Sequence, residues 1–219
     1  EENILSTLAF YNEQVANVRQ KTASQTDAAV KSLLTYEAKR ISWTRALEWD
    51  AGKGREHKFD DGKIVVAHYR PFFKQQLYFS RALNEMVYLI PKLFPLPDTE
   101  NLVICVSGLG GTKDNTAFIT DCIPDLNILD AGTQCFPLYY YEKQEKRNQT
   151  LFDAAAESEY TRRDGVTDFI LNRARRMYGN RVQKEDIFYY VYGILHSPDY
   201  RTEFADDLKK MLPHIPLVE

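Results

Sequence analysis

The apolar positions of the first fifty residues repeat at helical spacing. One face of an amphipathic helix is formed by Ile4, Leu8, Tyr11, Val15 and Val18. After a polar gap, we expect a second helix through residues 28–34, capped by Thr26 or Asp27. Residues 50–63 are polar and contain glycine, so they are expected to form a loop.

The pattern changes from helix to strand in the middle of the chain. Short apolar runs predict strands at residues 64–70, 77–79, 102–106, 117–120 and 136–141. The glycine-rich residues 107–116 are the expected turn of a hairpin between two of these strands. The apolar positions of residues 83–90 indicate a short helix that Pro91 ends.

Helical spacing returns after a charged linker at residues 142–150. One helical face is formed by Val166, Phe169, Ile170, Ala174 and Met177. A strongly apolar helix follows at residues 187–195. Ser197 and Pro198 then form an N-cap and first-turn pair that starts a last helix, which Pro213 ends.

Together these patterns predict an α+β fold with N-terminal helices, a central β-rich region with hairpins and a helical C-terminal part. The expected boundaries are residues 1–48 for the N-terminal helices, 49–141 for the β-rich core and 142–219 for the C-terminal part. The sequence opens inside a predicted helix without a methionine. We therefore expect one compact domain excised from a longer chain.

Composition adds limits on the compartment. The chain has 44% hydrophobic and 27% charged residues, which is ordinary for a folded domain. No apolar run is long enough to span a membrane, and no export leader is visible. The three cysteines have no C-x-x-C spacing, and their odd number suits free thiols in a reducing compartment. We expect a cytoplasmic protein with no membrane partner.

Catalytic motifs are not recognisable in the sequence. The turn at residues 108–113 matches neither a P-loop nor a dinucleotide-binding loop, and a plain hairpin turn is the simpler interpretation. The four histidines have no second ligand at metal-binding spacing. No nucleophile–base pair can be defined. We expect no enzyme activity and no cofactor in this chain.

Positive charge is concentrated in two segments although the formal net charge is −3. Residues 39–81 carry ten basic and five acidic side chains, and residues 162–184 carry seven and two. Trp43, Trp49, Tyr69 and Phe73 are interleaved with the first segment, so cations and aromatics together could bind nucleic acid. The alternative is that each charged segment is only the solvated face of the fold.

Several separated blocks of this sequence resemble one protein family in order. These blocks are Phe10-Tyr-Asn-Glu-Gln-Val15, Arg40-Ile-Ser-Trp-Thr-Arg45, Tyr69-Arg-Pro-Phe-Phe-Lys-Gln-Gln-Leu-Tyr-Phe79, Ile123-Pro-Asp-Leu126, Gln134-Cys-Phe-Pro137 and the run from Asp186 to Pro216. Together they resemble the C-terminal target-recognition domain of type ISP restriction-modification enzymes. In that family a nuclease, an ATPase motor, a coupler and an adenine-N6 methyltransferase precede this domain.

The resemblance implies sequence-specific recognition of duplex DNA, which positions the methyltransferase domain of the same parent chain on its target adenine. S-adenosylmethionine, ATP and Mg²⁺ are then expected in the parent and not in this chain. One alternative is a helical interaction module that docks onto the methyltransferase or coupler while other domains contact DNA. An autonomous enzyme is a third hypothesis, which the missing catalytic motifs disfavour.

The candidate DNA-contacting residues are the cations and amides of the first basic segment and of the glycine-rich turn. We interpret Tyr69, Pro71 and Phe72 as scaffold, and Arg70 as a phosphate clamp or a buried ion-pair partner. Base readout is expected from the loops at residues 50–63 and 107–116. The complete set of expected contacts is Lys39, Arg40, Arg45, Lys53, Arg55, Lys58, Arg70, Lys74, Gln75, Gln76, Lys113 and Asn115.

Overall fold

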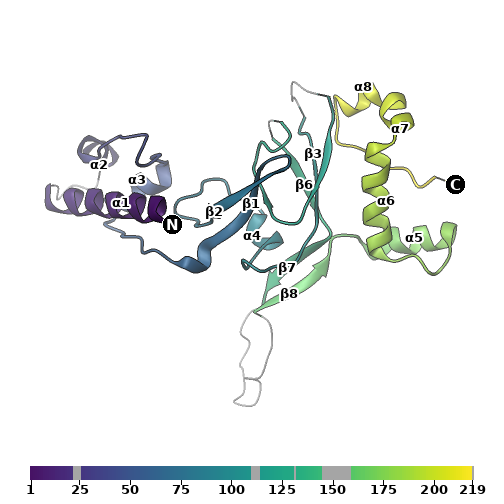
Figure 1. The fold of residues 1–219 in the computed structure, drawn as a ribbon, viewed down its shortest axis with the longest axis horizontal. Helices are drawn as coiled ribbons and strands as arrows, with labels where there is room; N and C mark the ends of the chain where they lie inside the picture. Colours follow the sequence, from purple (N-terminus) through teal and green to yellow (C-terminus); the bar gives the residue numbers. More distant parts are fainter. Residues whose placement is uncertain (22–25, 110–113, 131, 145–158, 219) are drawn as a thin grey trace, which may run out of the picture. The chain divides into compact units, whose positions relative to one another are not determined.

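The computed structural model describes residues 1–21, 26–109, 114–130, 132–144 and 159–218. It combines helices with three small sheets, so the predicted α+β class is confirmed (Figure 1). By their contacts the residues form two units. The first is Glu1–Val65 with Leu77–Tyr88, and the second is Val66–Gln76 with Leu89–Glu219. The three segments expected from composition are a different division and stay a prediction.

The first unit is built around the long helix α1 (Glu2–Lys21), and both helices predicted at this end are confirmed. Its other elements are α2 (Asp27–Leu33), α3 (Arg45–Gly52) and the 3₁₀ turn η1 (Asp61–Lys63). Tyr11, Val15 and Leu47 are fully buried in the core that these helices share. The Tyr11 hydroxyl donates to the Arg55 carbonyl at 3.0 Å, which ties the following loop to the core.

Helix α3 corrects the expected loop at residues 50–63, because the helix continues to Gly52. Thr44 caps it by accepting a hydrogen bond from the Leu47 amide, and Leu47 and Ala51 face the core. A Cβ at Gly52 would lie 3.0 Å from Val30 on α2. This glycine therefore permits close packing of two helices, whereas the sequence pattern suggested a loop.

Three sheets lie wholly or mainly in the second unit. The first has the order β2-β1-β5, from β1 (Ile64–Arg70), β2 (Phe73–Tyr78) and β5 (Ile123–Pro124). The second has the order β4-β3-β6, from β3 (Val103–Val106), β4 (Ala117–Thr120) and β6 (Gln134–Pro137). The third pairs β7 (Tyr139–Lys143) with β8 (Tyr160–Asp164). Strand β3 is buried along its whole length, as its continuous apolar run predicts.

Three local predictions in this region are wrong. The strand expected at residues 77–79 begins earlier, at Phe73. The helix expected at residues 83–90 is not formed, because Met86 and Tyr88 have positive φ, and the short helix α4 (Ile90–Leu93) instead contains Pro91 in its first turn. Strand β8 lies where helical structure was expected, and its alternating side chains pair in register with β7.

The C-terminal helices are α5 (Asp168–Tyr178), α6 (Lys184–His196), α7 (Pro198–Glu203) and α8 (Ala205–Leu208). Helices α6, α7 and α8 pack on the second sheet of this unit, and α5 packs on α6 (Figure 1). Phe188 and Leu195 of α6 pack in one cluster with Ile104 and Val106 of β3. The predicted α6 is confirmed, and the Ser197 hydroxyl accepts from the Tyr200 amide as expected of an N-cap.

Two details of the C-terminal part differ from the prediction. The last helix is broken at Phe204 into α7 and α8. On α5 the buried positions are Leu171 and Ala174, whereas Phe169 is 75% exposed and Met177 is 41% exposed. Within the part of the chain that is described, no helix combines the length and apolar character needed to cross a lipid bilayer.

Candidate nucleic-acid interface

A β-hairpin in the second unit presents four of the predicted DNA-contacting residues. Arg70 is the last residue of β1, and Lys74, Gln75 and Gln76 lie on β2, where all of them are exposed. Strand β2 is at the edge of its sheet, so its outer side has no neighbouring strand. The hairpin therefore offers cations and amide side chains on one continuous segment.

Each cation of the hairpin has an acidic partner in the segment that follows β4. Arg70 lies 3.2 Å from Asp125, and Lys74 lies 2.6 Å from Asp121. The Arg70 guanidinium also stacks 4.0 Å from the centre of the Tyr69 ring. Arg70 is thus an ion-pair partner, but with 47% of its side chain exposed it is not the buried one that the sequence suggested as an alternative.

A hydrogen-bonded network lies beneath the hairpin, at its junction with β4 and β5. His68 is buried, and its Nδ1 is 2.7 Å from the Thr120 hydroxyl and 3.6 Å from the Cys122 sulfur. Burial lowers the pKa of His68, and the nearby Lys74 ammonium lowers it further. Burial raises the pKa of the Cys122 thiol. The network is therefore neutral at its centre and anchors the hairpin.

The same network brings together three potential metal ligands, namely His68, Asp121 and Cys122. The Asp121 carboxylate is bonded to Lys74, which holds the pKa of Asp121 below its usual range. The Lys74 ammonium already neutralises this carboxylate. The three side chains therefore suit a hydrogen-bond network that includes Lys74 better than they suit a divalent metal ion.

The structure describes the glycine-rich turn only in part. Lys113 lies outside the described residues. Asn115 is half-buried, and its backbone carbonyl accepts a hydrogen bond from Arg201 at 3.1 Å. Asn115 and Arg201 line a pocket of about 390 Å³ together with Asp114 and Lys209. The base contacts predicted for this turn remain predictions.

In the first unit, Lys53 and Arg55 flank an exposed tryptophan. Trp49 is 50% exposed, with the Arg55 guanidinium 4.6 Å and the Lys53 ammonium 5.8 Å from the centre of its ring. Arg55 also forms an ion pair with Asp50 at 2.9 Å. Cations stacked on an aromatic ring form a surface that can hold a phosphate and a base together.

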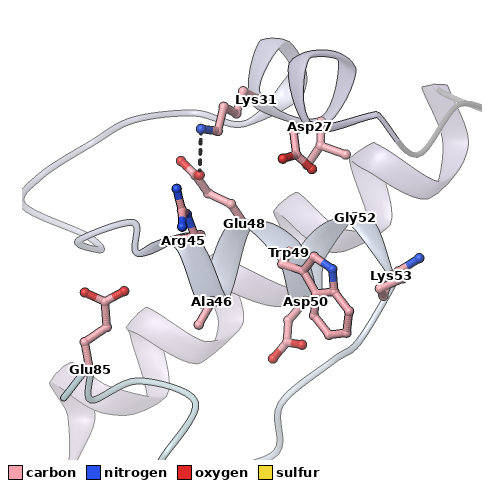
Figure 2. Close-up of a pocket in the computed structure, with 11 residues that line it drawn as sticks. Asp27, Lys31, Arg45, Ala46, Glu48, Trp49, Asp50, Gly52, Lys53 and Glu85 are labelled. Atoms are coloured by element: carbon pink, nitrogen blue, oxygen red, sulfur yellow. Dashed lines mark ion pairs between the residues drawn. The ribbon is translucent and has the colours of Figure 1, made fainter.

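A pocket of about 770 Å³ adjoins this tryptophan (Figure 2). Three basic and four acidic side chains line this pocket. Two of them, Lys31 and Glu48, form an ion pair at 3.2 Å. Arg45 at the start of α3 belongs to this lining. The pocket as a whole is not cationic, so Arg45 has a poorer setting for a phosphate contact than Arg55, which lies outside this lining. Lys53 lines the pocket and also lies beside Trp49.

The remaining candidates of the first unit are dispersed. Lys39 and Arg40 lie in a turn, where Arg40 pairs with Glu37 at 3.3 Å and lies 5.0 Å from the centre of the Phe10 ring. Lys58 is exposed in the loop after α3. The structure thus brings together Lys53 with Arg55, and separately the four residues of the hairpin.

Four basic residues of the second segment make contacts within the fold. Arg162 stacks 4.3 Å from the centre of the Tyr139 ring, and Arg163 pairs with Glu142 at 3.0 Å. Arg175 donates to the Val182 carbonyl, and Lys184 is held between Asp164 and Asp168 at 2.7 Å each. These contacts join β7, β8, α5 and α6, which supports the interpretation of this segment as a solvated structural face.

Sequence reasoning misjudged one residue at this interface. Phe72 was interpreted as scaffold, but its side chain is 91% exposed at the tip of the hairpin and its φ is 66°. The pattern that could have revealed it is Pro71-Phe72 between two strands, because a proline followed by a residue of positive φ is a turn arrangement. This turn is visible in the sequence only if β2 is taken to begin at Phe73 rather than at Leu77.

Comparison with known proteins assigns the class of this domain. The profile of the type ISP C-terminal specificity domain matches residues 1–219. The chain therefore belongs to this family, as the resemblance of its sequence blocks indicated. No curated protein matches the chain.

Solved structures with the same fold include three much longer proteins. A nuclease-deletion mutant of the type ISP restriction-modification enzyme LlaGI, in complex with a DNA substrate mimic, has a TM-score of 0.80 and 30% identity over 100% of this chain. A DrdV–DNA complex has a TM-score of 0.78 and 31% identity over 97% of it. The ATP-dependent type ISP enzyme LlaBIII bound to DNA has a TM-score of 0.77 and 27% identity over 100% of it. The chain spans 18%, 18% and 13% of these proteins, respectively.

Proposed function

We propose that this chain recognises a specific sequence of duplex DNA as part of a type ISP restriction-modification enzyme, and that it positions the adenine-N6 methyltransferase on its target. The observation that carries the proposal is membership of the specificity-domain family along the whole chain. Three proteins that share its fold were solved with DNA or a DNA mimic, which supports the same function. Any catalysis, with its S-adenosylmethionine, ATP and Mg²⁺, belongs to other domains of the parent.

The candidate surfaces suit duplex DNA chemically. The hairpin carries Arg70 and Lys74 for phosphates, and Gln75 and Gln76 have the amide geometry that pairs with an adenine edge. Lys53 and Arg55 beside Trp49 supply a second cationic and aromatic surface. The ion pairs of Arg70 and Lys74 are largely exposed, so these two cations can exchange a carboxylate for a phosphate at little cost.

The test is selection of a binding sequence from duplexes with a randomised centre, followed by fluorescence anisotropy with selected and scrambled duplexes. We expect tighter binding to the selected duplex, and an affinity that falls steeply between about 50 and about 200 mM salt. No binding at low salt, or equal binding of both duplexes, would contradict the proposal.

Two substitutions separate positioning contacts from base contacts. Lys74→Gln should weaken binding to all duplexes and reduce the salt slope by about one. Gln75→Ala should instead relax the preference at one base pair. Arg163→Gln is the matched control, because this cation also has an acidic partner but lies outside the candidate residues.

A second role is favoured by helix α5. Phe169 is 75% exposed and Met177 is 41% exposed, and these apolar side chains suit docking onto the methyltransferase domain of the parent. Co-purification with a separately expressed methyltransferase domain tests this role. Phe169→Ala should reduce the recovered complex, and an unchanged recovery contradicts docking through this helix.

A further inference from the structure

The turn between β1 and β2 has an unusual residue at its second position. Pro71 and Phe72 are the two turn residues, and Phe72 has a φ of 66°. A proline followed by a residue of positive φ is the arrangement of a type II turn, in which glycine or asparagine normally takes the second place. Phenylalanine is strained in this conformation, since it has neither the freedom of glycine nor a polar side chain that bonds locally.

Packing within the domain does not account for phenylalanine at this place. The Phe72 side chain is 91% exposed, and its ring meets the edge of the Phe118 ring with 5.6 Å between the ring centres. Its neighbours Tyr69 and Phe73 are 42% and 56% exposed. A strained residue that gains so little burial is better explained by contact with a partner than by folding.

The shape of the hairpin indicates which partner it fits. Among the residues that the structure describes, β5 pairs with Ala67 and His68 of β1, and residues 69–76 continue beyond this pairing as a two-stranded ribbon. Residues 73–76 of β2 are all exposed. A two-stranded ribbon has the width of a DNA groove, and this one carries cations and amides beside its aromatic tip.

The tip is held ready for contact. The Phe118 ring, which meets Phe72, lies edge-on against His68 with 5.3 Å between the ring centres. The ribbon continues directly from Ala67 and His68, which pair with β5, and the buried His68 is 2.7 Å from the Thr120 hydroxyl. Because the tip is already ordered, little conformational entropy is lost when it binds.

We infer that the ribbon of residues 69–76 enters a groove of the duplex and that Phe72 inserts its ring between two adjacent base pairs, with Arg70 and Lys74 on the flanking phosphates. The inference rests on the proposed function and deepens it. Apolar side chains at the tips of DNA-binding elements act as wedges that part a base step and bend the duplex. Such a wedge selects sequences whose base steps part easily.

The test uses the 219-residue chain and the selected duplex, with 2-aminopurine placed at successive positions. Wild-type chain should raise the 2-aminopurine fluorescence at one base step, because the parted base loses its stacking. Phe72→Ala should abolish this rise and weaken binding about tenfold, whereas Phe72→Trp should keep both. Phe136→Ala is the matched control, an exposed phenylalanine outside the ribbon, and should behave as wild type.

The outcomes distinguish the wedge from the function on which it rests. If Phe72→Ala binds the duplex with wild-type affinity, the tip does not contact DNA, and its exposed ring is then explained by a protein partner. Weaker binding by Phe72→Ala, without a fluorescence rise in the wild-type complex, contradicts insertion. Failure of the wild-type chain to bind any duplex contradicts the proposed function itself. Unchanged urea unfolding of Phe72→Ala shows that its fold is intact.

Discussion

The hairpin tip and helix α6 use the same kind of side chain for opposite purposes. Both segments carry the sequence blocks that resemble the type ISP family, and both are rich in aromatics. In α6, Phe188 is 4% exposed and packs against β3, whereas at the tip Phe72 is 91% exposed. The aromatic residues of α6 therefore hold the fold together, whereas Phe72 at the hairpin tip exposes its ring to solvent.

Hydrogen bonding shows the same difference. The hydroxyls of Tyr190 and Tyr200 donate to the carbonyls of Pro216 and His214, which fastens the C-terminal segment to α6 and α7. At the hairpin the Tyr69 hydroxyl accepts a hydrogen bond from the neighbouring Arg70 at 3.3 Å. Aromatic content alone does not identify a binding surface, and the partners of each ring decide its role.

The largest expected effect is on stability. Phe188→Ala should lower the free energy of unfolding by about 3–5 kcal/mol, because it leaves a cavity between α6 and the sheet. Phe72→Ala should change it by less than about 0.5 kcal/mol, since the exposed ring contributes little packing. Urea unfolding followed by circular dichroism measures both, and similar costs for the two variants would remove the contrast.

The turn into α7 provides a second, smaller test of the structural region. Ser197→Ala should cost about 1 kcal/mol, because the Tyr200 amide loses its capping hydroxyl. Thr202→Ala on the same helix is exposed and should stay within about 0.5 kcal/mol of wild type. A neutral Ser197→Ala would show that the cap is not needed for this turn.

The hairpin should be more sensitive to acid than the α6 region. Burial and the Lys74 ammonium lower the pKa of His68, while Asp121 acts in the opposite direction. The unfolded chain therefore binds this proton more readily. The resulting stability is present above about pH 6.5 and is lost as the pH falls toward the folded-state pKa.

Urea unfolding at about pH 7.5 and about pH 5.5 measures this effect. Wild type should lose more stability between the two conditions than His68→Gln, which has no imidazole to titrate. Equal losses in the two proteins would show that His68 does not contribute to the pH dependence.

A small effect on stability is expected from the ion pairs of the hairpin. Asp121→Asn should cost less than about 1 kcal/mol, because the pair with Lys74 is exposed. The same change frees Lys74 for phosphate, so affinity for duplex DNA should rise. Glu142→Asn, which removes the partner of Arg163, is the control and should leave affinity unchanged. A lower affinity of Asp121→Asn would contradict a phosphate contact by Lys74.

Sequence patterns predicted the fold best where burial is periodic and continuous. The apolar spacing of α1, the unbroken run of β3 and the cap of α7 were each sufficient, because one physical effect dominates each element. The extent of α3 was missed because Gly52 serves helix packing rather than a loop. Strand β8 was missed because its exposed arginines obscure the strand alternation.

The candidate site was only partly predictable. Cation positions are visible in a sequence, but their acidic partners Asp121 and Asp125 lie about fifty residues from them and meet them only through the fold. The exposure of Phe72 depends on the exact turn between β1 and β2, and turn boundaries are where periodicity says least. Family resemblance named the class of domain without indicating which aromatic faces outward.

Hydrogen–deuterium exchange of the chain with and without the selected duplex tests the central contrast most directly. The account predicts that the amides of residues 69–76 exchange more slowly when the duplex is bound, whereas those of residues 187–200 keep their rates. Slower exchange at residues 187–200, together with unchanged rates at residues 69–76, would contradict it.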